Sequence, residues 1–259
     1  MQDQYVGDIG DFGKYGLLRA LCRPRTSLAG ISLGVVWYLV PNEDNRNDGR
    51  LTGYLKPSQP NRAALHRCDP KLYDCLEGLV NSGQRNVAAI REAAILPRRT
   101  VFYEAPLSYD GLPGRGNRTD HRASWLQGAL ETTKGCDIVF LDPDNGLESG
   151  TGCFAKLGPK YVYLDDVNRF ATQTSGLIIY HHTGRHGTVE MQVALRFEQL
   201  RKVIGSDWRL FALRYRRGTS RVYFVLSSLG LHGIIHERIS SFLETPWSQH
   251  FSLILPSGG

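Results

Sequence analysis

The chain has 259 residues, which is long for one domain and short for two, and its net charge is +6 at neutral pH. No segment approaches the roughly 18 uninterrupted apolar residues of a membrane span. The first residues have the features of neither a secretory signal nor a transit peptide. Five scattered cysteines without a C-x-x-C pair argue against a disulfide framework and a structural zinc site. We therefore expect a single cytoplasmic α/β domain over residues 1–259, with no membrane partner, and the mild positive charge permits a polyanionic one.

The first 30 residues predict a helical segment that precedes the sheet. Apolar residues from Phe12 to Leu21 recur at helical spacing, and Asp11 is expected to cap the start of the helix. Glycines in this segment let a ligand approach the backbone, and the first amides of a helix favour anions. A structural cap would explain Asp11 but not Lys14, so we expect Lys14 to belong to a site.

Continuous apolar runs predict strands that are buried on both faces of a parallel sheet. The strongest runs span residues 33–40, 137–142 and 176–181, and shorter ones span 100–103 and 161–164. Helical patterns lie at about 70–82, 84–94, 119–133 and 188–204.

The last two strong strand patterns, 208–215 and 221–228, are joined by five residues that include Gly218. So short a link predicts an antiparallel hairpin, which we expect at one edge of the sheet. Repeated strand–helix units closed by a hairpin describe a mostly parallel, Rossmann-like α/β sheet with helices on both faces.

Ligands of open α/β sheets bind beyond the carboxyl ends of the strands, and one polar loop at such an end follows residue 141. Asp142 ends the apolar run, and Pro143, Asp144, Asn145 and Gly146 follow. Such residues make good turns, but two acids at the end of a buried strand make each other harder to ionise, which indicates function. Amino-methyltransferases place an acid or amide there to accept hydrogen bonds from an exocyclic amine.

The loop 41–50 follows the first strand, where a Rossmann enzyme has a glycine-rich turn. It holds Glu43, Asp44 and Asp48, which could bind a ribose, a cofactor amine or a metal ion. A solvated polar loop is the alternative.

The third loop at a strand end begins with His181 and His182. Adjacent residues of a strand point to opposite faces, so the two rings are not expected to share one metal ion. We expect one of them to act as an acid–base group or a phosphate contact. His181 is the candidate, and the choice between the two stays open.

Arginines of the hairpin alternate with an aromatic residue. Arg214, Arg216 and Arg217 flank Tyr215, a pattern that can contact phosphates and stack on bases. A charged tip that only keeps the chain in solution is the alternative.

The order of these segments resembles the methyltransferases that act on adenine N6 of large-subunit ribosomal RNA, a branch of the S-adenosylmethionine-dependent class. That family has Asp-x-x-Lys-His before the sheet, and Asp11-Phe12-Gly13-Lys14-Tyr15 matches its Asp and Lys. The family's catalytic Asp-Pro-Pro-Tyr follows the fourth strand, and Leu141-Asp142-Pro143-Asp144-Asn145 keeps the acid and the first proline. The resemblance implies a methyltransferase-type fold, S-adenosylmethionine as cofactor and a nucleic-acid base amine as substrate.

Three hypotheses follow. In the first, a methyltransferase-like enzyme, Asp142, Asp144, Asn145, Lys14 and His181 are the catalytic candidates, and Glu43, Asp44, Asp48 and Asp11 are the cofactor-binding ones. Asp142 and Asn145 would orient the amine, Lys14 would assist at the substrate phosphate, and the hairpin arginines would hold the nucleic acid. The family's glycine motif after the first strand has no counterpart here before Gly49.

The missing glycines and the acidic loop favour the second hypothesis, a metal-dependent nuclease or phosphohydrolase. In it Asp142, Asp144 and Asp48 hold Mg²⁺ or Mn²⁺, and one of the two histidines is the general base. The third hypothesis is a nucleic-acid-binding module that has lost catalysis.

Overall fold

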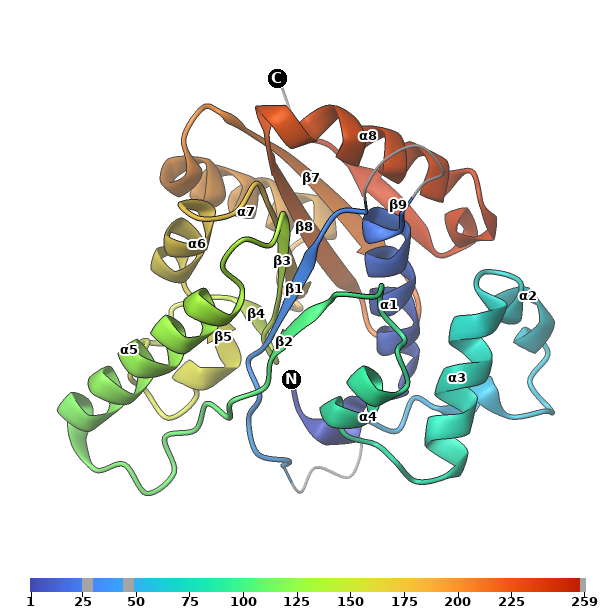
Figure 1. Cartoon of the computed structure of the whole chain (residues 1–259), viewed down its shortest axis with the longest axis horizontal. Coiled ribbons are helices and arrows are strands. Elements are labelled where there is room, and N and C mark those ends of the chain that lie inside the picture. Colours follow the sequence, from blue (N-terminus) through green and yellow to red (C-terminus); the bar gives the residue numbers. More distant parts are fainter. Residues whose placement is uncertain (25–29, 44–48, 257–259) are drawn as a thin grey trace.

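Seven strands form one sheet in the order β2-β1-β3-β6-β8-β7-β9 in the computed structural model, which describes residues 1–24, 30–43 and 49–256 (Figure 1). The strands are β1 (Leu33–Trp37), β2 (Val101–Tyr103), β3 (Ile138–Asp142), β6 (Gly176–His182), β7 (Trp208–Tyr215), β8 (Arg221–Ser228) and β9 (Phe251–Ile254). A separate two-stranded sheet pairs β4 (Gly146–Leu147) with β5 (Tyr161–Val162).

The middle of the large sheet is parallel. β1 lies between β2 and β3, and β3 lies between β1 and β6, all in parallel register. Every residue of β1 and of β3 is buried, which explains why both read as continuous apolar runs. The predicted adjacency of the runs at 33–40, 137–142 and 176–181 is confirmed.

The C-terminal hairpin is also confirmed, because β8 pairs antiparallel with both β6 and β7. Its expected position at the edge is wrong, since β9 pairs with β7 and forms that end of the sheet. Only four residues make up β9, too few for a clear periodic pattern.

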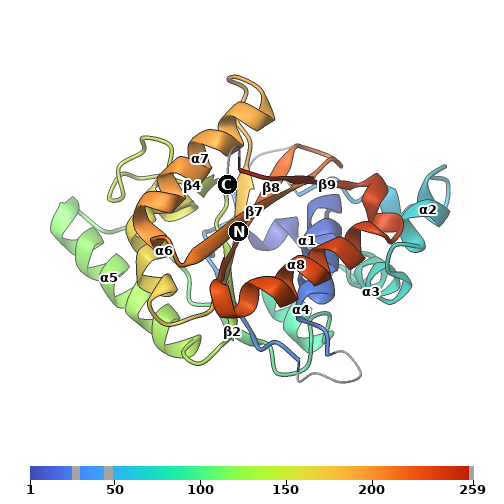
Figure 2. The ribbon, with the colours of Figure 1, turned by 90° about the horizontal axis from the view of Figure 1, so that it is seen from above.

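Helices cover both faces of the sheet. They are α1 (Ile9–Cys22), α2 (Arg62–His66), α3 (Pro70–Asn81), α4 (Val87–Glu92), α5 (Gly114–Thr132), α6 (Leu164–Ala171), α7 (Val189–Ile204) and α8 (Leu229–Leu243). In Figure 2 α5, α6 and α7 lie on one side of the sheet, and α1, α4 and α8 lie on the other with α3 beyond them. Each side has its own buried apolar cluster. The predicted fold class, a mostly parallel Rossmann-like sheet with helices on both faces, is confirmed.

Three local predictions need correction. Asp8, not Asp11, caps α1, because its carboxylate accepts from the backbone amides of Gly10 and Asp11. The run 161–164 is split, since Leu164 already begins α6. Helix α5 begins at Gly114, five residues before the expected start of the pattern at about 119.

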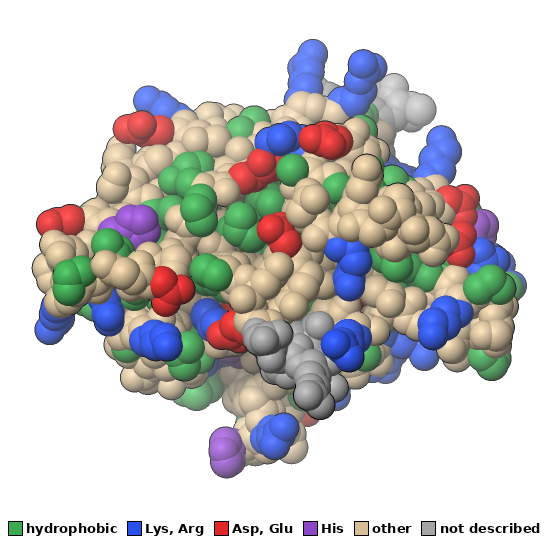
Figure 3. Space-filling view, turned by 90° about the horizontal axis from the view of Figure 1, so that it is seen from below, with side chains coloured by type: hydrophobic (Ala, Val, Ile, Leu, Met, Phe, Trp, Pro, Cys, Tyr) green, Lys and Arg blue, Asp and Glu red, His purple; other side chains and the backbone are tan. Residues whose placement is uncertain are grey.

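The carboxyl ends of β1, β3 and β6 lie along the lower side of the view in Figure 1, together with the loops that follow them. Chain connections leave β1 and β3 toward opposite ends of the sheet, so the switch point of strand order lies between these two strands. Lys and Arg side chains are spread over this lower face rather than gathered in one patch (Figure 3). Among the described residues, no helix combines the length and apolar composition needed to cross a membrane.

Candidate active site

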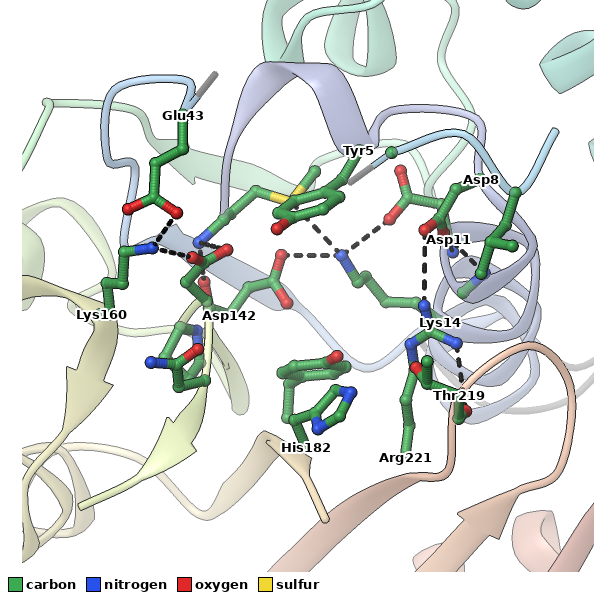
Figure 4. A pocket seen from close by; sticks show the side chains of 18 residues that line it. Tyr5, Asp8, Asp11, Lys14, Glu43, Asp142, Lys160, His182, Thr219 and Arg221 are labelled. Carbon is green, nitrogen blue, oxygen red and sulfur yellow. Dashed lines mark hydrogen bonds and ion pairs between the residues drawn. The ribbon is translucent and has the colours of Figure 1, made fainter. Parts of the chain in front are cut away.

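A cavity of about 500 Å³ lies at the carboxyl ends of β1, β3 and β6. This volume is in the range of small-molecule sites, roughly 300–1,000 Å³. Its lining comes from the first two turns of α1, the loop after β1, the turn after β3, the end of β6 and the hairpin tip (Figure 4). The residues that line it are Met1, Tyr5, Asp8, Gly10, Asp11, Lys14, Glu43, Gly49, Leu51, Asp142, Pro143, Asp144, Asn145, Lys160, Tyr180, His182, Thr219 and Arg221.

Lys14 joins two carboxylates at the base of this cavity. Its Nζ donates to Oδ1 of Asp11 and to Oδ2 of Asp142, both at 2.8 Å, and all three side chains are buried. The ammonium group also lies 5.5 Å from the ring centroid of Trp37 and 5.8 Å from that of Tyr180, close enough for cation–π attraction. Lys14 is therefore held in place on several sides.

Burial opposes the positive charge of Lys14, but Asp11 and Asp142 outweigh it and hold the pKa of Lys14 well above its usual range. Burial likewise raises the pKa of Asp142, and Lys14 offsets part of that rise. Lys14 contacts only Oδ2 of Asp142, and Asp142 lines the cavity, so Oδ1 can accept a hydrogen bond from a ligand. Lys14 thus holds one oxygen of the Asp142 carboxylate, and the other oxygen is available to a ligand in the cavity.

A second ionic group surrounds Asp144. Lys160 Nζ lies 3.0 Å from Oδ2 of Asp144 and 2.6 Å from Oε2 of Glu43, and Gln2 Nε2 donates to the same Oδ2 at 3.0 Å. Burial opposes the charge of Asp144, but the Met1 amino group and Lys160 outweigh it and lower the pKa of Asp144. Its Oδ1 is buried, lies 3.9 Å from the Met1 amino nitrogen, and has no hydrogen-bond partner among the described residues.

The third ionic group joins α1 to the hairpin. Arg221, at the start of β8, lies 3.4 Å from Oδ2 of Asp8, the residue that caps α1. Arg221 also donates to the backbone oxygens of Arg217 and Thr219, which fixes the hairpin tip against the cavity. A Cβ at Gly10 would lie 2.5 Å from the guanidinium carbon, so a glycine lets Arg221 reach this position.

The balance of charge around the cavity is negative. The lining includes five carboxylates, those of Asp8, Asp11, Glu43, Asp142 and Asp144, against three cationic side chains, Lys14, Lys160 and Arg221, and the Met1 amino group. Each of the three cations already lies beside at least one of these carboxylates. Such a lining favours a ligand that offers amines or a positive charge over one that brings a phosphate directly into the cavity.

The structure brings together most of the residues that the sequence singled out. Asp142, Asp144, Asn145, Lys14, Asp11 and Glu43 all line the cavity. Asp44 and Asp48 lie outside the described residues. Of the two histidines, His182 lines this cavity and His181 does not.

His181 instead lies on the other face of the sheet. Its Nδ1 accepts a hydrogen bond of 3.1 Å from the backbone amide of Leu147, and the ring packs against Phe224. Burial lowers its pKa to about 3, so the ring is neutral at physiological pH. These contacts fit a residue that holds β4 against β6, and they correct the placement of His181 beside Asp142.

The hairpin arginines make contacts within the chain. Arg214 lies 3.3 Å from Glu190, Arg216 donates to the backbone oxygen of Ser248, and Arg217 donates to Nδ1 of His250. Arg216 is exposed, whereas Arg214 and Arg217 are half-buried. Because Thr219 lines the cavity, the tip that carries Arg216 and Arg217 lies at its rim.

The proposed metal ligands are already engaged by cations. Lys14 lies beside Asp142, and Lys160 lies beside Asp144, where a metal ion would have to bind. In the described part of the chain no group of three or more His, Cys, Asp or Glu side chains is arranged to hold a metal ion.

Sequence reasoning missed several lining residues, chiefly Tyr5, Lys160, Tyr180 and Arg221. Tyr180 lies inside an apolar run of the sequence, and only its position near the end of β6 identifies it as a lining residue. Burial raises the pKa of Tyr180 to about 12, so its phenol stays protonated. Lys160 directly precedes the short strand β5, and nothing in the sequence around it marks it as a lining residue. Comparison of the chain with models of protein families and with curated proteins found no match.

Proposed function

We propose that this chain is a methyltransferase-like enzyme that acts on an amine of a nucleic-acid base in the cavity around Asp142. The observation that carries the proposal is the buried Asp11–Lys14–Asp142 group at the switch point of the sheet. Open α/β sheets bind their ligands at such a point. A carboxylate held by one oxygen and accessible through the other is suited to accept a hydrogen bond from an exocyclic amine.

The residues around Asp144 fit S-adenosylmethionine. Its sulfonium and amino groups are positively charged, and the lining has more carboxylates than cations. Oδ1 of Asp144 is a buried acceptor that lacks a hydrogen bond among the described residues, as an amine-binding oxygen would without its ligand. A smaller cavity of about 210 Å³ adjoins the first at Glu43 and Lys160, and it offers Ser108 and Asp110 for ribose hydroxyls. When bound, the cofactor supplies an electrophilic methyl group.

Asp142 and Asn145 have the central roles in this proposal. Oδ1 of Asp142 and the amide oxygen of Asn145 accept hydrogen bonds from the substrate amine and direct its lone pair. The N–C bond would form as the S–C bond of the sulfonium breaks, with the neutral thioether leaving, and the amine nitrogen would become positive and then release a proton. Asp142 can receive that proton, because burial raises its pKa. Lys14 acts through Asp142 as a positioning residue.

The metal-dependent alternative is less favoured by this geometry. A hard cation needs several oxygen ligands, and each of the two acids in the Asp-Pro-Asp turn lies beside a lysine. The two lysines would have to move before a metal ion could bind both carboxylates. The structure therefore supports methyl transfer better than metal-assisted hydrolysis.

Calorimetry tests the proposal directly. The purified protein is titrated with S-adenosylmethionine and, separately, with Mg²⁺ and Mn²⁺, and methyl transfer to RNA and DNA is then measured. We expect binding of S-adenosylmethionine that is lost in Asp144→Ala, and no dependence of transfer on the two metals. Binding of metal alone, with metal-dependent cleavage of nucleic acid, would replace this proposal by the second hypothesis.

A further inference from the structure

A second cavity, of about 380 Å³, lies beside the candidate active site on the α7 side of the sheet. Asn145 and His182 line both cavities. The backbone amide of His182 donates to the backbone oxygen of Asn145 at 3.1 Å, so the turn after β3 and the end of β6 form the partition between them. A ligand that crosses this partition would reach both cavities at once.

The chemistry of the second cavity is opposite to that of the first. Its lining includes Arg196 and Gln192 from the first two turns of α7, His186 from the preceding loop, and Ser149. None of the side chains that line it in the described structure is a carboxylate, whereas five carboxylates line the first cavity. The second cavity therefore suits an anion and the first suits an amine.

Arg196 is the charged residue of this cavity. Its Nη1 donates to the neutral amide oxygen of Gln199 at 2.7 Å, and the side chain is half-buried. Burial lowers the pKa of Arg196, and the more distant charge of Glu148 offsets this only in part. Glu148 itself accepts from the backbone amide of Leu164, at the start of α6. The protein itself therefore compensates the positive charge of Arg196 only in part, and an anion bound in the cavity would complete the compensation.

We propose that the second cavity binds a phosphate group of the nucleic-acid strand, beside the nucleotide whose base enters the first cavity. This inference rests on the proposed function, because it needs a ligand that joins a base to a phosphate. The guanidinium of Arg196 would contact the phosphate oxygens, and the ring of His186 would donate to one of them. Gln192 would shape the cavity from the side, because its amide already donates to the backbone oxygens of Gly184 and Gly187. Such a contact fixes the position of the strand without reading its sequence.

A titration with inorganic phosphate tests the site without any methyl transfer. The ring ¹H–¹⁵N signals of His182 and His186 are followed in the wild type, in Arg196→Gln and in Arg201→Gln. Arg201 is the matched control, since it lies on the same helix but lines a different cavity. We expect saturable shifts in the wild type and in Arg201→Gln, and phosphate binding at least about tenfold weaker in Arg196→Gln, as for one lost charged contact.

Two outcomes overturn the inference. One is the absence of saturable shifts in the wild type, which decides the matter whether or not the variants fold. The other is an equal effect of the two substitutions. Failure of the proposed function is distinct, because it would leave phosphate binding intact while S-adenosylmethionine does not bind. Conversely, an active wild type with the same KM for an oligonucleotide as Arg196→Gln would contradict only this inference.

Discussion

Nζ of Lys14 lies 2.8 Å from Oδ2 of Asp142, which joins helix α1 to the end of strand β3 across 128 positions of the chain. The same nitrogen lies 2.8 Å from Oδ1 of Asp11, so one buried cation serves two buried carboxylates. This arrangement links the stability of the fold to the chemistry of the site, because the group that keeps Asp142 in place also keeps the helix against the sheet.

Lys14→Met should strongly destabilise the protein. The substitution leaves Asp11 and Asp142 buried without their cation, and breaking a buried pair in this way costs about 3–5 kcal/mol. Urea denaturation at neutral pH measures the loss. Lys71→Met, at an exposed position of α3, is the control and should change stability by no more than about 0.5 kcal/mol. The deficit of Lys14→Met should shrink as the pH falls, because burial raises the pKa of Asp142 and its protonation removes an unpaired negative charge. Equal stability of the two variants would contradict the ion-pair interpretation.

Substitutions of Asp142 separate the two enzymatic hypotheses. Asp142→Ala should lower methyl transfer by at least about 10²-fold, the contribution of a positioned acid–base group. Asp142→Asn should keep partial activity in methyl transfer, because its amide carbonyl still accepts a hydrogen bond, but should abolish metal-dependent cleavage. Asp144→Asn should affect methyl transfer less than cleavage. Asp120→Asn, on the exposed side of α5, controls for the loss of one charge. Full activity of Asp142→Ala would place the site elsewhere.

The two arginines at the hairpin tip, Arg216 and Arg217, should contribute to nucleic-acid affinity without sequence preference. Arg216→Ala with Arg217→Ala should weaken binding similarly for all sequences and flatten its salt dependence by up to about two phosphate contacts. Adding Arg214→Ala should change little more, because Arg214 already pairs with Glu190. Affinities measured across a salt series give the slope. Arg209→Ala, at the opposite end of β7, is the control and should leave the salt dependence unchanged. If the triple variant of Arg214, Arg216 and Arg217 binds with unchanged affinity and slope, these arginines serve solubility alone.

A pair of glycine substitutions tests how closely α1 packs. A Cβ at Gly13 would lie 2.6–2.7 Å from ring atoms of the buried Tyr215, whose hydroxyl donates to the backbone oxygen of Ile9. Gly13→Ala should therefore lower stability by about 1–3 kcal/mol through overpacking. Gly78→Ala, in α3, meets nothing within 4 Å and should raise stability by about 0.5–1 kcal/mol. Thermal unfolding of both variants checks the opposite signs, and a stabilising Gly13→Ala would refute the close approach.

His181 should contribute to the acid sensitivity of the fold. Its pKa is about 3 in the folded chain, against an ordinary value of 6.5, because burial disfavours the charged ring. The unfolded chain therefore binds more protons between these values, and each pH unit below 6.5 should remove about 1.4 kcal/mol of stability. His181→Asn keeps an acceptor for the Leu147 amide but cannot titrate there. Denaturation at pH 7 and pH 4.5 should show a smaller acid-induced loss in this variant, and an unchanged loss would contradict a neutral, buried His181.

The sequence by itself determined the frame of this fold. The runs at 33–40, 137–142 and 176–181 are continuous because both faces of these strands are buried, and continuity of that kind is visible without coordinates. The five-residue link between 208–215 and 221–228 leaves few options other than a hairpin. The prediction that the Asp-Pro turn after residue 141 belongs to the site followed from the rule that open α/β sheets bind their ligands at the carboxyl ends of the strands.

Only the tertiary structure decided how the site is assembled. Lys160 and Arg221 come close to Asp144 and Asp8 through contacts between elements far apart in the sequence, and no local spacing encodes such contacts. The choice between His181 and His182 depended on which face of β6 turns toward the cavity. Side chains alternate between the two faces of a strand, but the alternation does not say which of two adjacent residues faces the cavity. The charge of a cavity is likewise a sum over elements that meet only after folding, and here that sum separates an acidic cavity from a neighbouring basic one.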